Sequence, residues 1–401
     1  MGRIERGIRV IANMVLIIET SLSLHLLSSG TKVSLESLRA IATGCPRLRH
    51  FSLRESSDVS EKNLWEIFKG CHFLERVDIR GCPRVVGHLF RLANERLVSV
   101  HLERCAKLDD RSLAHLVAQC PKMTELDLSN CHALTPTGLA KIAEFPHLET
   151  LTMRQMNLSG PVSLDAIIRP EVLRHLDLSQ NRCVTHTDLD VIYARCSELR
   201  HLNLSCCYTL NGLNFVRLSW SLRQLEYLNL SYVVVDMFGI PMPNPLDPPV
   251  AHLRELHLVA IPGFENRSLA YCLRLSALTS LDVSGNFELT NAAFAHEDPE
   301  TEPTAIRVEN ELLRRRDRSI KIKIGGTRIN RAELEASPEL PYEFSTFDSS
   351  ITSLRQDRHV IDYFDSDDSD YADDDSLGAG GDLDDFDYLD PVEEFERNWM
   401  S

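Results

Sequence analysis

The chain lacks the patterns that mark membrane proteins, zinc or thiol-redox proteins and nucleotide-binding enzymes. The apolar run from Val10 to Ile18 is too short to cross a bilayer, and Glu19 ends it. None of the 11 cysteines lies in a Cys-x-x-Cys arrangement. The sequence also contains no Gly-rich phosphate loop, no metal-spaced His/Cys cluster and no nucleophile elbow. We therefore expect no catalytic residue, no metal, no cofactor and no enzymatic activity.

The chain also lacks an excess of basic residues, with 43 Lys and Arg against 59 Asp and Glu and a formal net charge of -16. From Asp362 to the C-terminus there are 16 acidic residues against one basic residue, Arg397, so the remainder is close to neutral. A near-neutral body offers no general basic field to nucleic-acid phosphates, and the acidic end would repel them. We expect neither nucleic acid nor a membrane as a partner.

The cysteines are typical of reduced, packed thiols in an intracellular protein, because many keep a fixed place in a repeat. The run from Val10 to Ile18 follows a basic start and could imitate a signal peptide, but no small-residue cleavage site clearly follows it. Secretion is the alternative reading, and the thiol pattern argues against it. We expect a cytoplasmic location, a nuclear location or both.

An internal repeat dominates the sequence. The phrase Leu-x-x-Leu-x-Leu recurs with conservative replacements every 23 to 28 residues. An imperfect earlier copy, with Leu24 and Leu26, lies one period before Phe51 and Leu53. The phrase begins at Leu48, Leu74, Leu97, Met123, Leu148, Leu173, Leu199, Leu225, Leu253 and Leu278.

Each repeat then shows apolar residues at helix spacing, such as Leu38, Ile41 and Ala42. Good N-caps precede several of these segments, including Thr135 before Pro136. Each unit is therefore a short strand followed by a helix. Parallel stacking of these units predicts an α/β solenoid, with a curved parallel sheet inside and helices outside.

The segment Leu97-Val-Ser-Val-His-Leu-Glu-Arg-Cys105-Ala-Lys-Leu closely resembles the cysteine-containing leucine-rich repeat of F-box/LRR proteins, and the unit from Met123 to Leu148 matches equally well. Family resemblance implies that the chain recognises a protein substrate for a cullin-RING (SCF-type) ubiquitin ligase in ubiquitin-dependent degradation. The family's F-box, a helical module before the repeats, is not present in this chain. Either a longer form carries it and contacts the ligase adaptor, or the chain is an F-box-free relative.

The alternative function is an F-box-independent scaffold or regulator that uses the acidic tail as an interaction element. In layout alone, the acidic tail resembles leucine-rich acidic nuclear phosphoproteins and Ran GTPase-activating proteins, whose repeats lack the cysteine pattern.

Two sets of cysteines keep constant places in the repeat. One set lies three residues after the last strand leucine, where Asn181 and Asn286 stand in other units; there a Cys or Asn side chain can bond the turn backbone of the adjacent coil. The other set lies three residues before the strand phrase. Both sets predict packing rather than catalysis or metal binding, and the vicinal pair Cys206 and Cys207 has no base beside it. The two sets are Cys82, Cys105, Cys131 and Cys207, then Cys45, Cys71, Cys120 and Cys196.

Strand alternation turns the leucines inward and their neighbours toward the inside surface of the arc. We expect this concave face to contact a protein, although Leu-Asp-Leu-Ser is also a common, solvated filling of the repeat. The candidate partner-binding residues are Arg54, Asp78, Arg80, His101, Glu103, Asp127, Arg154, Asp177, Asn203 and His257.

The chain divides into three parts on these grounds. Residues 1–30 form an incomplete first repeat or N-terminal cap, residues 31–330 form ten to eleven repeats, and residues 331–401 form a linker and a disordered acidic tail. Two interruptions lie within the repeats. Five prolines at 241–249 forbid a helix, and this segment is either a loop that helps form the ligand site or a degenerate outer helix. The second interruption is an acidic stretch at 296–304, which precedes a terminal cap.

Overall fold

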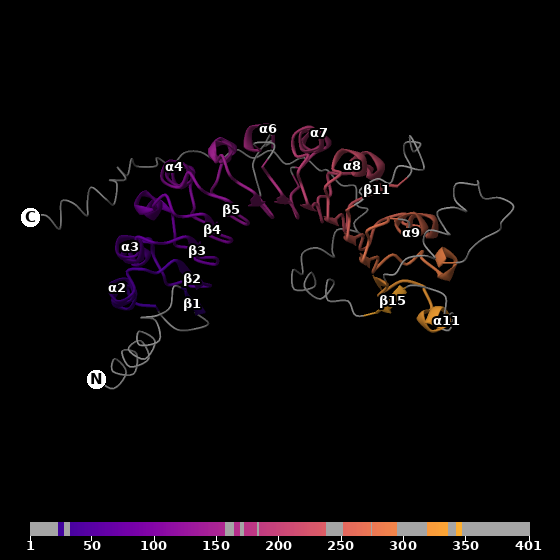
Figure 1. Cartoon of the computed structure of the whole chain (residues 1–401), viewed down its shortest axis with the longest axis horizontal. Coiled ribbons are helices and arrows are strands. Elements are labelled where there is room, and N and C mark those ends of the chain that lie inside the picture. The colour runs from indigo at the N-terminus through magenta and orange to yellow at the C-terminus, as the bar shows by residue number, and fades with distance from the viewer. Residues whose placement is uncertain are drawn as a thin grey trace, which may run out of the picture. The chain divides into compact units, whose positions relative to one another are not determined.

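The computed structural model describes residues 23–27, 33–156, 164–168, 172–182, 184–237, 252–273, 275–294, 319–335 and 342–346, all within the unit Met1–Asp348. In this unit, thirteen strands form one parallel sheet in which neighbours follow chain order. Strands line the inner side of an arc and helices its outer side (Figure 1). The strands are β1 (Ser23–Leu27), β2 (His50–Arg54), β3 (Arg76–Asp78), β4 (Ser99–His101), β5 (Glu125–Asp127), β6 (Thr150–Thr152), β7 (His175–Asp177), β8 (His201–Asn203), β10 (Tyr227–Asn229), β12 (Glu255–His257), β13 (Ser280–Asp282), β14 (Ile320–Lys323) and β15 (Tyr342–Ser345).

The outer layer mixes α-helices with tighter 3-10 turns, and a separate two-stranded sheet pairs β9 (Leu213–Asn214) with β11 (Val235–Asp236). The predicted α/β solenoid is therefore confirmed. The outer elements are α2 (Leu35–Gly44), α3 (Glu61–Gly70), η1 (His88–Leu92), α4 (Asp110–Gln119), α5 (Pro136–Leu139), η2 (Ala140–Glu144), α6 (Leu164–Ile167), α7 (His186–Arg195), α8 (Phe215–Ser221), α9 (Asn266–Cys272), η3 (Asn291–Phe294) and α11 (Arg331–Glu335).

The strand phrase sets the register of the sheet. Counting its first leucine as the first position, the fourth and sixth positions turn into the core, as Leu126 and Leu128 do, both fully buried. Leu126 pairs with Val100 on one side and Leu151 on the other, so fourth positions stack upon one another along the sheet. Each repeat covers the apolar edge of its neighbour, which is why no unit is stable alone.

The N-caps of the outer helices largely follow the sequence. At α7, the Thr185 amide donates to Asp188 Oδ2 at 2.8 Å and completes the expected capping box. At α4, the N-cap is Asp109, whose side chain accepts from the Ser112 amide at 3.0 Å. These bonds satisfy amides that have no partner within the helix.

One set of cysteines ends helices. Cys45, Cys71, Cys120 and Cys196 are the C-caps of α2, α3, α4 and α7, and each amide donates to the carbonyl four residues earlier. Burial raises the thiol pKa to about 12 at Cys71, Cys120 and Cys196. These thiols stay protonated at neutral pH and serve as small apolar side chains.

The other set forms the expected ladder at the ninth position. Each thiol donates to the carbonyl oxygen of the sixth position in the preceding repeat, as Cys131 does to Leu102 at 3.2 Å. Asn181 makes stronger bonds at the same place, donating to Met153 O at 2.6 Å and accepting from the Met156 amide at 2.7 Å. The remaining thiol donors are Cys82, Cys105 and Cys207.

The eighth position takes a left-handed backbone conformation along the whole array. Its φ lies between 49° and 76°, and eight of these residues are not glycine. Cys206 is one of them, so the vicinal pair occupies the eighth and ninth positions and is structural. The residues are Glu55, Gly81, Arg104, Asn130, Gln155, Gln180, Cys206, Tyr232, Ala260, Gly285 and Gly326.

The ends of the sheet differ partly from expectation. The imperfect first copy forms β1, in which Leu24 pairs with Phe51. At the other end, β14 is not the last strand: β15 pairs with it in parallel, beyond residue 330, where a linker was predicted. The strand was missed because Tyr342-Glu-Phe344-Ser lacks the leucine phrase, although Phe344 is buried. The Pro-rich stretch 241–249, the acidic stretch 296–304 and the tail from Asp362 lie outside the described residues.

Candidate functional site: the concave face of the sheet

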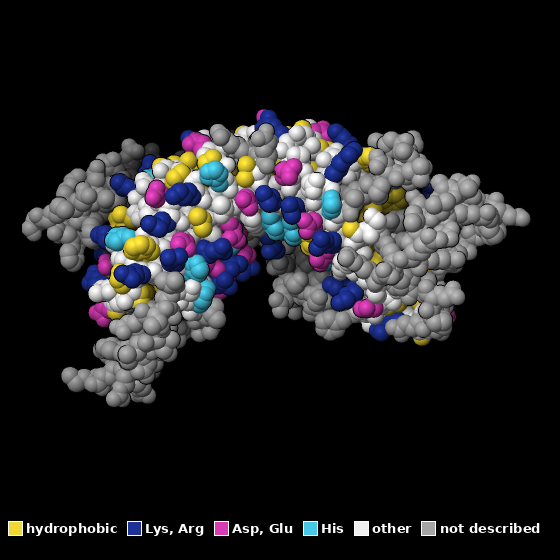
Figure 2. All heavy atoms as spheres, in the orientation of Figure 1, with side chains coloured by type: hydrophobic (Ala, Val, Ile, Leu, Met, Phe, Trp, Pro, Cys, Tyr) yellow, Lys and Arg dark blue, Asp and Glu magenta, His cyan; other side chains and the backbone are white. Residues whose placement is uncertain are grey.

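All ten predicted partner-binding residues lie on the strand face that points away from the core. Alternation about the buried fourth and sixth positions brings the third, fifth and seventh positions to this face. Six of the ten occupy the fifth position and four the seventh: Asp78, His101, Asp127, Asp177, Asn203 and His257, then Arg54, Arg80, Glu103 and Arg154. Basic, acidic and imidazole side chains lie side by side along the inner side of the arc (Figure 2).

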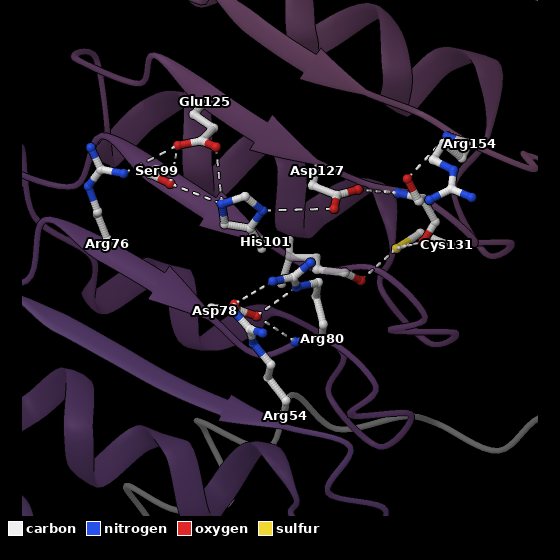
Figure 3. Close-up of polar contacts among 12 residues, drawn as sticks. Arg54, Arg76, Asp78, Arg80, Ser99, His101, Glu125, Asp127, Cys131 and Arg154 are labelled. Carbon is white, nitrogen blue, oxygen red and sulfur yellow. Dashed lines mark hydrogen bonds and ion pairs between the residues drawn. The ribbon is translucent and has the colours of Figure 1, made fainter. Parts of the chain in front are cut away.

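The first charged cluster joins Arg54, Asp78 and Arg80. Both guanidinium groups converge on the same carboxylate, with Arg54 Nε and Arg80 NH2 at 2.7 and 2.8 Å from Asp78 Oδ2 (Figure 3). Burial by itself would raise the pKa of Asp78, but the bonds from Arg80 and then Arg54 outweigh it and lower that pKa. Asp78 is only 9% exposed, so its charge serves the protein's own arginines rather than lying free for a partner.

The second charged cluster centres on His101. Its Nε2 lies 3.3 Å from Glu125 Oε1 and its Nδ1 lies 3.8 Å from Asp127 Oδ2 (Figure 3). Burial would lower the pKa of His101, but the bonds to Asp127 and Glu125 outweigh burial and raise it to about 9. His101 is therefore a cation at neutral pH. Arg76 NH1 lies 3.6 Å from Glu125 Oε2 and extends the cluster to β3.

The polar centre of the face has a structural task that the sequence did not reveal. At six repeats, the fifth-position side chain accepts from the seventh-position amide, as Asp177 Oδ1 does from Ser179 at 2.9 Å and Asp78 Oδ1 does from Arg80 at 3.4 Å. This bond holds the backbone just before the left-handed eighth position. Asp127 is 8% exposed and accepts from the Ser129 amide in the same way, so this carboxylate also binds the protein's own backbone. The other pairs are Asn203 with Ser205, Asn229 with Ser231 and Asp282 with Ser284.

A stacked aromatic row at the third position was missed altogether. His175, His201 and Tyr227 come from β7, β8 and β10, and consecutive ring centroids are 3.8 Å apart with interplanar angles of 13° and 3°. The ring of His257 lies 5.3 Å from that of Tyr227 and is tilted. We call these four residues the aromatic ladder. The prediction from the sequence covered only the fifth and seventh positions of each repeat and therefore missed the stacked rings. The third positions show His, His and Tyr in successive repeats.

The pKa values of the ladder imidazoles are shifted in different directions. Burial lowers the pKa of His201 to about 3, and His175 and His257 push in the same direction, so His201 is neutral at neutral pH. At His257, burial is outweighed by bonds to Asp282 and Glu255, which raise its pKa. His257 Nε2 lies 2.8 Å from Glu255 Oε1, and Lys323 Nζ lies 3.4 Å from Asp282 Oδ2. The ladder thus ends in a charged cluster toward β14.

The described residues hold no group of three or more His, Cys, Asp or Glu side chains suited to a metal ion. Their cysteines are all buried, and no helix among them is long and apolar enough to cross a membrane. A small cavity between the outer elements is lined by apolar side chains, including Ile142, Phe145 and Ile167. None of its lining side chains is polar, so none of them could orient a polar ligand.

Sequence comparisons agree with this architecture. A family profile described as "Leucine Rich repeat" matches residues 119–143. A Caenorhabditis elegans protein named as RNA-binding, EEED8.10, is 26% identical over 280 residues, which cover 66% of this chain and 36% of that protein. F-box/LRR-repeat protein 4 of Bos taurus is 28% identical over 159 residues, covering 38% of this chain and 25% of the relative. An Arabidopsis thaliana F-box/LRR-repeat protein, At3g58880, is 30% identical over 108 residues, covering 27% and 23%.

The chain spans between 23% and 36% of the length of these curated relatives. Among solved structures, a chain of the yeast Rad7–Elc1 complex is similar with a TM-score of 0.46 and 15% identity, over 66% of this chain and 63% of that one. Legionella pneumophila LegL7, a leucine-rich repeat-containing protein, has a TM-score of 0.41 and 16% identity, over 74% and 98%. The chain therefore carries leucine-rich repeats built into a solenoid, the repeat class that its strand phrase indicates.

Proposed function

We propose that this chain is a non-enzymatic protein-binding solenoid whose concave face recognises a protein substrate. The observation that carries the proposal is the aromatic ladder. Half-buried aromatic side chains supply large, rigid contact surfaces, and such residues are enriched at the centres of protein interfaces. In a sheet filled mainly by Asp, Asn and Ser, three stacked rings on neighbouring strands form the surface best suited to anchor a partner.

The proposal includes substrate recognition for a cullin-RING ubiquitin ligase of the SCF type. Its support is the cysteine ladder, together with the two relatives named as F-box/LRR-repeat proteins. Contact with the ligase adaptor would require a longer form that carries an F-box. The proposal also includes a cytoplasmic or nuclear location, where buried thiols such as those of the two cysteine sets remain reduced.

The second candidate is a scaffold or regulator that binds partners without reaching a ligase, with the acidic tail as a binding element. The observation that favours it is the composition from Asp362 onward, which combines 16 acidic residues with aromatics. The two candidates share the concave face and differ in what happens to the bound protein.

Nucleic acid remains outside the proposal, although one relative is named as an RNA-binding protein. On the described concave face, Arg54, Arg76 and Arg80 are each paired with a carboxylate. Internal pairing leaves those cations poorly placed to neutralise phosphates, which supply most of the affinity in nucleic-acid binding.

Affinity purification of the full-length chain from its native cells tests the ligase assignment. We expect a cullin and its adaptor to co-purify with a set of proteins, and members of that set to accumulate when the chain is depleted. If no cullin co-purifies and the captured proteins keep constant levels on depletion, the ligase assignment is wrong and the scaffold remains. RNA recovered in place of protein would contradict both candidates.

A further inference from the structure

Arg154 differs from the other arginines on the described concave face. Arg54, Arg76 and Arg80 each contact a carboxylate within 4 Å, whereas no ion pair or side-chain hydrogen bond joins Arg154 to any described residue. Its backbone amide donates to Ser129 Oγ at 3.1 Å, which fixes the residue beside β5. Figure 3 shows the Arg54 and Arg80 guanidinium groups meeting Asp78, while that of Arg154 has no contact with the residues drawn.

Two residues in adjacent repeats each have a buried polar side-chain atom without a hydrogen-bond partner among the described residues. One of these atoms is Nε of Arg154 itself, and the other is Oγ of Ser179, the seventh-position residue of the next repeat, which is 2% exposed. A buried donor without an acceptor is costly, and most such groups in proteins find a partner. No described residue supplies an acceptor oxygen to this guanidinium nitrogen.

The surroundings of Arg154 carry no competing carboxylate. The seventh positions on either side are Ser129, Ser179 and Ser205. The nearest fifth-position acid in the next strand, Asp177, is engaged by the Ser179 amide at 2.9 Å and by Asn203 Nδ2 at 3.0 Å. The site therefore offers one unpaired positive charge among serine hydroxyls.

We propose that Arg154 is a specificity-determining residue that receives a carboxylate side chain, Asp or Glu, of the bound protein. The inference rests on the proposed binding of a protein to the concave face. A guanidinium matches a carboxylate in both geometry and charge, since two parallel N–H donors meet two oxygens. A phosphate monoester carries about -1.5 to -2 charges at neutral pH, which one guanidinium would leave partly unneutralised.

Arg80 provides a matched control at the same repeat position. Its NH2 lies 2.8 Å from Asp78 Oδ2, so replacing it leaves a buried carboxylate with one cation fewer. Arg154→Gln leaves no such group behind. We expect Arg80→Gln to lower the thermal midpoint and Arg154→Gln to leave it unchanged, which separates a residue kept for a ligand from one that stabilises the fold.

The binding test uses the full chain and three pools of degenerate nine-residue peptides that differ only in a fixed central Glu, Gln or phosphoserine, with single-stranded RNA as a fourth probe. We expect the wild type to bind the Glu pool about tenfold more tightly than the Gln pool, equivalent to about 1.4 kcal/mol. Arg154→Gln should abolish this preference and Arg154→Lys should keep part of it. Arg76→Gln, which removes a more exposed and paired arginine, should leave the preference intact.

Equal binding of the Glu and Gln pools, no binding of any pool, or a Glu preference that persists in Arg154→Gln would each overturn the inference. A stronger preference for phosphoserine, or Arg154-dependent binding of RNA, would overturn the carboxylate assignment and identify the alternative ligand. The peptide preference could be absent while substitutions in the aromatic ladder still abolish the capture of proteins. In that case Arg154 does not bind a partner carboxylate, but the concave face still binds protein. Failure of both would remove the proposed function as well.

Discussion

At the scale of single residues, the polar side chains of this solenoid mostly bind its own backbone. Fifth-position Asp and Asn accept from the seventh-position amide, and ninth-position Cys and Asn bond the preceding repeat. The Leu-Asp-Leu-Ser pattern is therefore neither a binding signature nor idle filling. Where the fifth-position bond is present, it holds the backbone just before the left-handed eighth position.

The ninth-position side chain should contribute more to the free energy of unfolding where it is Asn than where it is Cys. Asn181→Ala would remove bonds of 2.6 and 2.7 Å and leave the buried Met156 amide without an acceptor, so we expect a loss of about 2 to 4 kcal/mol. Cys131→Ala removes one weak thiol bond to Leu102 and should cost about 1 kcal/mol. Urea denaturation of both variants measures the difference; equal losses would mean that the amide bonds contribute nothing beyond packing.

The cluster around His101 should make stability depend on pH. Because the folded pKa, about 9, lies above the ordinary value of 6.5, the folded protein binds this proton more tightly than the unfolded chain. Its contribution is complete below about pH 6.5 and is lost as the pH rises through about 9. We expect His101→Gln to reduce the fall in stability between pH 6.5 and 9, measured from urea midpoints. An unchanged slope would show that His101 does not hold an extra proton in the folded state.

At the scale of elements, the leucine phrase predicts the strands. Its apolar residues alternate with a period of two, and its copies recur about every 25 residues, so only one register of neighbouring strands buries all the leucines. Helix faces follow from the same logic, and Leu38, Ile41 and Ala42 are buried in α2 as predicted. Local caps such as Thr185 with Asp188 depend on neighbours in the sequence and were also predictable.

Contacts between repeats were less predictable. Arg54 binds Asp78, which lies 24 residues away on the next strand, instead of being left for a partner protein. This choice depends on the side-chain conformations of both residues, which the sequence does not give. The aromatic ladder likewise depends on which third positions become neighbours, and this is known once the register is fixed. The concave location of the ten candidate residues could be deduced from the sequence, whereas the pairing of several of them, such as Arg54 with Asp78, could not.

The register itself is open to a direct test. Leu126 is fully buried at the fourth position of β5, so Leu126→Ala should cost about 2 to 5 kcal/mol and unfold at least the neighbouring repeats. Thr152→Ala, at a half-buried outward position of β6, serves as the control and should change stability by less than about 0.5 kcal/mol. Hydrogen exchange would locate the loss; a cost near that of the control would contradict the assigned register.

At the scale of the whole molecule, stability accumulates through contacts between neighbouring repeats. Charged clusters lie toward β2–β5, serines surround Arg154 near β6, and the aromatic ladder occupies β7 to β12. Most cations on this face are neutralised internally. Recognition would therefore depend on shape, ring edges and a few unpaired groups rather than on a general electrostatic field.

The most direct test of the central claim is the affinity of a captured protein for the ladder. Isothermal titration calorimetry would compare the wild type with the double variant His201→Ala and Tyr227→Ala, after thermal unfolding has shown that the fold survives. Tyr227→Phe keeps the ring, and Phe73→Ala removes an aromatic side chain that is 41% exposed and lies outside the strand positions of the concave face.

We predict that the double variant weakens binding at least tenfold, corresponding to about 1.4 kcal/mol, while Tyr227→Phe and Phe73→Ala bind as the wild type does. Undiminished binding by a folded double variant would contradict the claim that this protein recognises its partner through the concave face of the sheet.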